Sequence, residues 1–286
     1  MTGRYWHAAH ICFDNSARLT RDVYYFEYRG TRFKLIQNNP RKWSDVLLTI
    51  VPADDRKAQQ RAYAIAGEFL SALAWENGSR VALANCGGPG VPDRYTLRKA
   101  RCRVFTFPQV PFGGHMVGYG LSVIPDIETD VQRIALTLFR EARSSNKVWL
   151  AFLFYWQVME VGGDNAVGWV NSVYYKQRKV HLGSEELQGL PLKGRRIGEY
   201  LEDDCRHAIA HIRRRPGKTA LRLDVGDENR RIAASTGVVK RFAEHYIRER
   251  LGLKKKVYLV RRRGRGFPTY VDQAIEHRRY SVLAYP

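Results

Sequence analysis

The chain has 286 residues, of which 44% are hydrophobic and 12% are aromatic. This composition excludes a wholly disordered chain and can fill the core of one large domain or of two small ones. The formal net charge is +20, from 48 Lys and Arg against 28 Asp and Glu. A charge of this size favours a polyanionic partner, and nucleic acid before a membrane surface.

The positive charge is concentrated in the last part of the chain. From Arg206 onward there are 21 Lys and Arg against 7 Asp and Glu, so +14 of the +20 lies in 81 residues. Basic side chains that bind phosphates release counterions, so binding to a nucleic acid should weaken steeply with salt. The alternative interpretation is a solvated basic surface without a partner.

Cysteine spacing and hydrophobicity indicate a cytoplasmic protein. The four cysteines are Cys12, Cys86, Cys102 and Cys205. They form no CxxC pair and lie far apart, which favours reduced thiols over disulfides or a zinc finger. Residues 1–10 contain no apolar signal core. The longest apolar stretch, 148–161, includes Gln157 and Glu160 and is too short to span a bilayer, so we expect a buried helix and no membrane partner.

Residues 1–125 have the pattern of a mixed α/β domain that is rich in strands. The runs 23–28 and 32–37 flank a glycine-containing turn and should form a hairpin. Residues 53–77 repeat apolar side chains at helical spacing and end at an Asn-Gly stop signal. Further strands are expected at 46–51 (closed by Pro52), 80–85, 104–107 and 116–124. The sequence gives no indication of this domain's role.

From residue 126 onward the hydrophobic pattern is helical. Helices are expected at 127–142, 148–161, 197–215 and 227–251. Asp126 and Asp227 are the expected caps, and 169–193 should be rich in loops. Four helices over 126–252 predict an all-α four-helix bundle, so the fold class of the chain is α+β. Residues 253–286 should follow as a basic tail.

The helix over 197–215 carries the densest group of chemically useful side chains. Arg206 is followed directly by His207, and His211 comes after four intervening residues. An imidazole can take the proton from a ribose 2′-OH, and a guanidinium can hold the phosphodiester and stabilise the charge of the transition state. This transesterification needs no metal and no cofactor, because the nucleophile belongs to the substrate. DNA lacks the 2′-OH, so RNA is the expected substrate.

A regular α-helix, with about 100° between residues, predicts where these side chains point. The core-facing set is Ile197, Leu201, Cys205, Ala208 and Ile212. A neighbouring polar stripe contains Tyr200, Asp203, Asp204, His207 and His211. Arg206 projects away from the core, toward solvent or a partner, where it could also pair with Glu202 one turn earlier.

The motif resembles that of a known family. Arg206 and His211, with the polar His207 directly after the arginine, resemble the signature of HEPN-domain ribonucleases, in which four to six residues separate an Arg and a His. The expected four-helix bundle is similar to that family's fold, and the helix with Glu160 resembles its partner helix with an acidic residue. The combination is also similar to HEPN proteins described as methylamine utilisation MauJ. The resemblance covers roughly the second half of the chain.

The resemblance implies a metal-independent RNA endonuclease that acts as a toxin or as an antiviral (abortive infection) effector. It assigns His211 as general base or acid, Arg206 as the phosphate-binding residue and His207 as the assisting polar residue. Glu160 would orient Arg206 from the adjacent helix. The resemblance also implies a homodimer, with the active site where two motif helices meet. An antitoxin or a trigger molecule is a further possible partner.

Basic residues that follow the motif are the candidate RNA-binding residues. They are Arg213, Arg214, Arg215, Lys254, Lys255, Lys256, Arg261, Arg262 and Arg263. In the tail, basic blocks alternate with aliphatic and aromatic residues, a pattern that suits phosphate contact and base stacking. An interaction arm or a solvated edge is the alternative.

Two other functions compete with RNA cleavage. The first is a non-catalytic RNA-binding or regulatory HEPN protein. The second is a metal-dependent hydrolase, because Asp203, His207 and His211 follow one another at four-residue spacing, and two such histidines can bind zinc. Three ligands along one helix do not easily reach one ion, which disfavours this function. His115 and His245 have no neighbouring chemistry in the sequence and are assigned no role.

Overall fold

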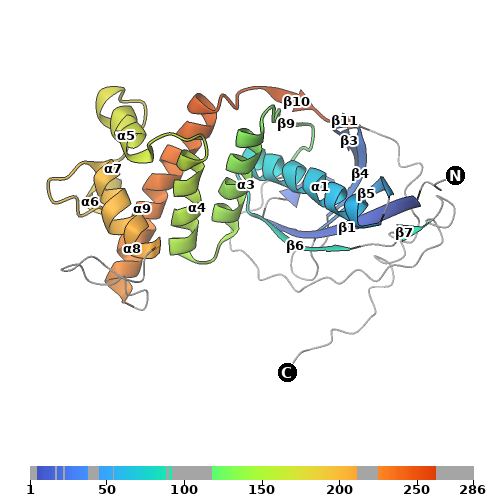
Figure 1. Ribbon diagram of the computed structural model, residues 1–286, viewed down its shortest axis with the longest axis horizontal. Helices are drawn as coiled ribbons and strands as arrows, with labels where there is room; N and C mark the ends of the chain where they lie inside the picture. Colours follow the sequence, from blue (N-terminus) through green and yellow to red (C-terminus); the bar gives the residue numbers. More distant parts are fainter. Residues whose placement is uncertain are drawn as a thin grey trace. The chain divides into compact units, whose positions relative to one another are not determined.

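The computed structural model has a mixed α+β fold, with an N-terminal sheet region and a helical C-terminal region (Figure 1). The expected α+β class is confirmed at this level. The chain divides into two compact units, and the divisions fall after Ile124 and after Lys256. The structure describes residues 5–16, 18–21, 23–37, 45–53, 55–87, 90–91, 118–210 and 225–261.

The first unit is built on an antiparallel sheet that contains seven strands within the described residues (Figure 1). The strand order is β11-β3-β4-β5-β1-β6, and β7 pairs with β1. The strands are β1 (Tyr5–Asn15), β3 (Val23–Tyr28), β4 (Thr31–Ile36), β5 (Asp45–Ala53), β6 (Val81–Gly87), β7 (Gly90–Val91) and β11 (Val260–Arg261). A separate parallel pair joins β2 (Arg18–Leu19) to β8 (Gly118–Tyr119).

The expected hairpin is confirmed in β3 and β4. The two strands pair along their whole length, and Arg29 and Gly30 form the two-residue turn between them. Both turn residues have positive φ, 47° and 68°, which suits the turn types that match the twist of paired strands. Alternation along β3 then buries Tyr24, Phe26 and Tyr28 on one face.

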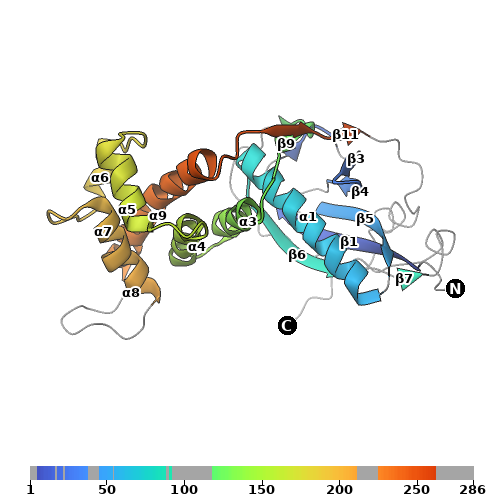
Figure 2. The same ribbon diagram turned by 45° about the horizontal axis from the view of Figure 1, so that its top comes forward.

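The helix α1 (Asp55–Asn77) packs against β1, β5 and β6 and closes the core of the first unit (Figure 2). Its Phe69 ring lies 4.7 Å from the ring of Phe26 and 6.0 Å from that of Phe33, measured between centroids. The helix ends before Gly78, whose φ is 59°. The helix predicted over 53–77 is therefore confirmed, with its stop signal.

Some strand boundaries differ from the prediction. β5 continues through Pro52 to Ala53, because the pairing with β1 extends to the Tyr5–Ala53 register. Residues 116–124, expected as one strand, contain β8 and the start of β9 (Val123–Pro125), which are separated by Gly120–Ser122. The strand expected over 104–107 lies outside the described residues.

Residues 253–286 do not begin as a separate tail. The backbone N–H of Asp126 donates to the carbonyl of Lys255 at 2.9 Å, and β10 (Lys256–Tyr258) pairs with β9. Next, β11 pairs with β3 at the edge of the large sheet. The alternation of basic and apolar residues up to Arg261 thus belongs to strands with paired backbones. Residues from 262 onward lie outside the described part.

The second unit is helical. Its elements are α3 (Asp130–Ser144), α4 (Val148–Glu160), α5 (Ala166–Asn171), η1 (Ser172–Lys176), α6 (Ser184–Gln188), α7 (Ile197–Tyr200), η2 (Leu201–Arg206), α8 (His207–Ala210), α9 (Gly226–His245) and η3 (Tyr246–Arg250), where η marks a π-helical segment. The apolar α4 packs against both α3 and α9 (Figure 1). Among the described helices, none has the length and apolar character needed to cross a membrane.

Several local predictions for this unit are corrected. Thr129 caps α3, in a capping box with Gln132, so Asp126 is not the cap. The cap position of α9 is Val225, and Asp227 lies in the first turn instead. Residues 169–193 are more helical than expected, because they include the end of α5, η1 and α6. The helix that begins at Ile197 is not one regular α-helix, since η2 interrupts it.

Candidate functional site

The candidate site is carried by the segment α7-η2-α8, whose start is fixed by contacts to α5 and η1. The backbone N–H of Gly198 donates to Asn171 Oδ1 at 3.0 Å, and that of Ile197 donates to the Tyr175 hydroxyl at 3.2 Å. These bonds satisfy two N–H groups that lack partners within the helix. A Cβ atom at Gly198 would lie 2.8 Å from the Val167 carbonyl oxygen, so glycine allows this close approach.

The π-helical segment η2 changes where the motif side chains point. The backbone N–H of His207 donates to the carbonyl of Glu202, five residues earlier, instead of the residue four earlier. The wider turn rotates the side chains that follow it away from the directions that a regular α-helix would give them. Leu201 and Cys205 are buried, as expected, but Tyr200, expected on the polar stripe, is fully buried as well.

Arg206 pairs with Glu160 of α4. Its Nη2 lies 3.6 Å from Glu160 Oε1, and the two side chains are 30% and 36% exposed. Glu160 Oε1 also accepts a hydrogen bond of 2.8 Å from Nε1 of the buried Trp156. The prediction that Arg206 points away from its own core is therefore wrong in part, because the side chain contacts the central helix while a third of it remains exposed.

His207 lies between two carboxylates of its own segment. Its Nε2 lies 3.2 Å from Glu202 Oε1, and its Nδ1 lies 3.6 Å from Asp203 Oδ1. Both ring nitrogens thus have an anionic neighbour, and Glu202 contacts His207 where the sequence suggested a pair with Arg206. We call Glu160, Glu202, Asp203, Arg206 and His207 the Arg206 cluster.

The metal-binding set expected from Asp203, His207 and His211 is only partly described. Asp203 and His207 are neighbours, whereas His211 lies outside the described residues. Within the described ranges, no group of three or more His, Cys, Asp or Glu is arranged as a metal site.

Arg231 of α9, whose side chain is partly buried, anchors α7 and η2 to α9. Arg231 Nη1 donates to the Tyr200 hydroxyl at 3.3 Å and to the Asp204 carbonyl at 3.2 Å. Burial raises the pKa of Tyr200 to about 12, and burial also raises the pKa of the Cys205 thiol. Both groups are therefore neutral near pH 7, which suits a structural anchor and disfavours Cys205 as a nucleophile.

The remaining candidate residues lie in the basic segments. Lys254 Nζ is 2.9 Å from Glu249 Oε2, and Lys255 Nζ is 2.6 Å from Glu128 Oε1. Both ammonium groups are exposed, so these pairs are weak and can exchange for a phosphate. Lys256 is exposed on β10. Only the backbone of Arg261 is described, and these residues lie outside the described part: His211, Arg213, Arg214, Arg215, Arg262 and Arg263.

Sequence reasoning missed two residues of this region. Trp156 precedes Glu160 by four residues on one helix, so its contact with the carboxylate could have been found from helical spacing. Arg231 lies on α9, and no local pattern connects it to Tyr200 or Asp204. Its role depends on tertiary packing alone.

Comparison with known proteins shows a match to a protein family in the helical unit. A family model described as "Methylamine utilization protein MauJ" matches residues 135–248. The matched range includes Trp156, Glu160, Arg206 and His207, and it lies within the helical unit. The chain is thus similar to MauJ over this range, as the sequence suggested. No curated protein and no solved structure matches the chain.

Proposed function

We propose that the chain is a metal-independent RNA endonuclease of the HEPN type, which acts as a toxin or as an antiviral effector. The observation that carries the proposal is the contact of Arg206 with Glu160 on the neighbouring helix, with His207 directly beside it. The proposal takes α3, α4, α7-η2-α8 and α9 as the four helices of a HEPN-like bundle over residues 126–252. Their mutual packing supports this interpretation.

The proposed reaction uses the ribose of the substrate as nucleophile. The 2′-oxygen attacks phosphorus, the bond from phosphorus to the 5′-oxygen breaks, and the products carry a 2′,3′-cyclic phosphate and a 5′-hydroxyl. His211 takes the proton from the 2′-OH or gives a proton to the leaving 5′-oxygen. Arg206 holds the phosphodiester and stabilises its added negative charge. His207 assists as a polar neighbour.

Glu160 and Trp156 would fix the guanidinium before substrate binds. The carboxylate is itself held by the 2.8 Å hydrogen bond from Trp156, and this bond limits the directions in which Arg206 can point. A guanidinium positioned in advance loses less conformational freedom when it binds a phosphate. The exposed third of Arg206 leaves room for that contact.

A homodimer is part of this proposal. The family resemblance implies that two motif helices meet at the subunit interface, where a second copy would complete the site. RNA would lie along the basic residues at 213–215, 254–256 and 261–263, with Lys254, Lys255 and Lys256 exposed for such contact. An antitoxin or a trigger would act as a further partner.

The test is RNA cleavage by the full chain in the presence of EDTA. Arg206→Ala and His211→Ala should each lower the cleavage rate by about 100-fold or more and leave RNA binding largely intact. Arg230→Ala is the matched control, because Arg230 is an exposed arginine of α9 that pairs with the nearby, equally exposed Asp227. Cleavage that survives both motif substitutions would rule out the proposed reaction. Loss of activity in EDTA would favour a metal-dependent hydrolase.

A non-catalytic RNA-binding or regulatory HEPN protein is the second candidate. It is favoured by the contacts that Arg206 and His207 make with carboxylates of their own chain, since such pairs also occur in purely structural helices. Under this function the purified chain shifts RNA in a gel but never cuts it.

A further inference from the structure

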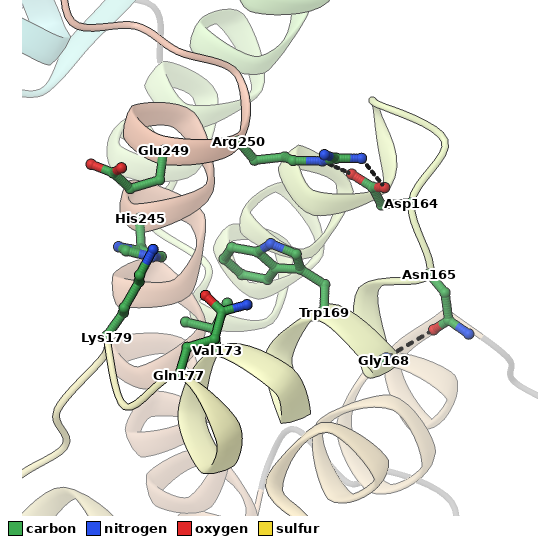
Figure 3. A pocket seen from close by; sticks show the side chains of 10 residues that line it. All are labelled: Asp164, Asn165, Gly168, Trp169, Val173, Gln177, Lys179, His245, Glu249 and Arg250. Atoms are coloured by element: carbon green, nitrogen blue, oxygen red, sulfur yellow. Dashed lines mark hydrogen bonds and ion pairs between the residues drawn. The ribbon is translucent and has the colours of Figure 1, made fainter.

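A pocket of about 440 Å³ lies in the helical unit, apart from the residues of the Arg206 cluster. Its walls come from the loop after α4, from α5 and η1, and from the ends of α9 and η3 (Figure 3). The side chain of Trp169 lies at its centre, with the pair Asp164–Arg250 on one side and His245 with Lys179 on another. We call it the Trp169 pocket. Its volume is within the range of small-molecule sites, about 300–1,000 Å³.

The Trp169 ring is a fixed platform. Its centroid lies 5.0 Å from that of Tyr246 and 6.3 Å from that of Phe242, and both contacts are edge-to-face, with interplanar angles of 80° and 78°. Tyr246 and Phe242 are fully buried, whereas Trp169 is partly exposed. An aromatic surface held in this way can accept a planar ring at little cost in conformational entropy.

One side of the pocket has its charges already paired. Arg250 donates from Nε to Asp164 Oδ2 and from Nη2 to Asp164 Oδ1, both at 2.9 Å. The Tyr246 hydroxyl donates to Asp164 Oδ2 at 2.7 Å. These bonds hold the pKa of Asp164 below its usual value. The pair is therefore a stable wall, and it leaves no net charge for a ligand to neutralise.

The other side contains two side-chain donors, Lys179 and His245, for which the described residues supply no acceptor. Neither the Lys179 ammonium nor the His245 ring, which lie close together in Figure 3, makes a hydrogen bond or ion pair within the described residues. Glu249 Oε2 is paired with Lys254 Nζ at 2.9 Å. The imidazole lies 5.9 Å from the Trp169 ring, between centroids. Burial and the nearby cations Lys179, Arg248 and Lys254 outweigh Glu249 and lower the pKa of His245. The imidazole is therefore mostly neutral near pH 7 and offers an N–H donor, while the Lys179 ammonium supplies the positive charge beside it.

Two π-helical segments border the Trp169 pocket. η1 contributes Val173, and η3 contributes Glu249 and Arg250. Segments of this kind are uncommon and occur frequently at functional sites, where they displace side chains from their regular helical directions. This backbone feature supports a binding role independently of the side-chain chemistry.

We propose that the Trp169 pocket binds a small ligand in which a planar ring carries an oxyanion. The ring stacks on Trp169, and the oxyanion lies between Lys179 and His245. A carboxylate and a phosphate monoester share this chemistry, and both match the ammonium and imidazole donors. The binding does not depend on the proposed RNA cleavage, so either can fail without the other.

The test uses three ring-matched probes with the full chain, measured by isothermal titration calorimetry. The probes are 1-naphthoate, 1-naphthyl phosphate and the neutral 1-naphthamide. At least one anion should bind about tenfold or more tightly than the amide, because a charge-assisted hydrogen bond is worth that much. Preference for naphthoate identifies a carboxylate ligand, and preference for naphthyl phosphate identifies a phosphate monoester. Failure of both anions to bind more tightly than the amide overturns the proposal.

Variants locate the binding. Lys179→Ala should weaken the binding of the preferred anion about tenfold. Because the Lys179 side chain is exposed, the substitution should not disturb folding. The matched control is Lys176→Ala, which removes the same charge from an exposed residue that does not line the pocket. Equal effects of the two substitutions would show non-specific attraction and reject the site. Trp169→Phe locates the ring. In NMR spectra of the full chain, one indole N–H resonance should shift when the anion binds, and this substitution should remove it. Thermal unfolding checks that the variant is folded.

Discussion

The Arg206 cluster and the Trp169 pocket belong to the same helical unit, and each adjoins π-helical backbone, but their charges are arranged differently. In the cluster, Arg206 and His207 both contact carboxylates of the chain. In the pocket, Lys179 and His245 have no such contact within the described residues. The proposed reaction at the cluster therefore requires that ion pairs within the chain hold Arg206 and His207 in position. The proposed binding at the pocket requires instead that Lys179 and His245 donate hydrogen bonds to the ligand.

Gly198 connects the two regions, and its substitution should have the largest effect on stability. It begins the segment that carries Arg206, and it contacts Val167 and Asn171 of α5, the helix that carries Trp169. In Gly198→Ala the new Cβ would meet the Val167 carbonyl oxygen at 2.8 Å, so the free energy of unfolding should fall by about 1–3 kcal/mol. Chemical denaturation measures this change.

Gly237→Ala is the matched control for Gly198. Gly237 lies within α9, and nothing lies within 4 Å of a Cβ atom added there. Alanine at an open helical position should stabilise the protein by about 0.5–1 kcal/mol. Equal effects of the two substitutions would contradict the tight docking of Gly198 on α5.

Glu160→Gln should impair the cluster and leave the pocket unchanged. The amide keeps the shape of the side chain but removes the charge that faces Arg206, so RNA cleavage should fall about tenfold. Binding of the preferred naphthyl anion should stay within a factor of about two. Cleavage assays and calorimetry on the same preparation measure the two effects, and a loss of both would show that the regions are coupled.

Acidification should destabilise the protein through His245. The folded protein lowers the pKa of His245 below its ordinary value of 6.5, so the unfolded chain binds the proton more readily. The stability from this residue is present above pH 6.5 and declines as the pH falls below it. The Tm of the protein should therefore fall between pH 7.5 and pH 5.5, and His245→Gln should make this fall smaller. His181→Gln, at an exposed position, is the control and should leave the fall unchanged.

Lys179→Ala should have the smallest effect on RNA cleavage. Lys179 lies at the Trp169 pocket and makes no contact with the Arg206 cluster within the described residues. We expect the RNA cleavage rate of the Lys179→Ala variant to stay within about twofold of the rate of the unsubstituted protein. A larger loss, measured under the same salt conditions, would mean that the pocket contributes to RNA cleavage.

Regular elements could be predicted from local sequence. The hairpin of β3 and β4 follows from alternating hydrophobicity around Arg29-Gly30, and α1 follows from its helical repeat and the stop at Gly78. In both, the decisive interactions connect residues that are close in sequence. The contact between Glu160 and Arg206 follows from the family resemblance and not from periodicity.

The π-helical segments and the pocket could not be predicted in the same way. A bond from His207 to the carbonyl five residues earlier has no recognisable sequence pattern. Tyr200 is expected on the polar stripe but is buried, where its hydroxyl contacts Ser235 and Arg231, residues of α9 that are distant in sequence. His245 was assigned no role, because its neighbours Trp169 and Lys179 are distant in sequence. Residues 169–193 have a mixed pattern that predicts a loop-rich segment, and nothing in it predicts η1 or the pocket wall that Trp169, Val173 and Lys179 form.

The most direct test of the proposed function is the chemistry of the RNA ends. The full chain is incubated in EDTA with an RNA that it cleaves and with the same RNA carrying a single 2′-deoxyribose at the cleavage position. We predict 2′,3′-cyclic phosphate and 5′-hydroxyl ends from the first RNA and no cleavage at the modified position in the second. Cleavage at the 2′-deoxy position would contradict the proposed reaction, because the attacking 2′-oxygen is absent there.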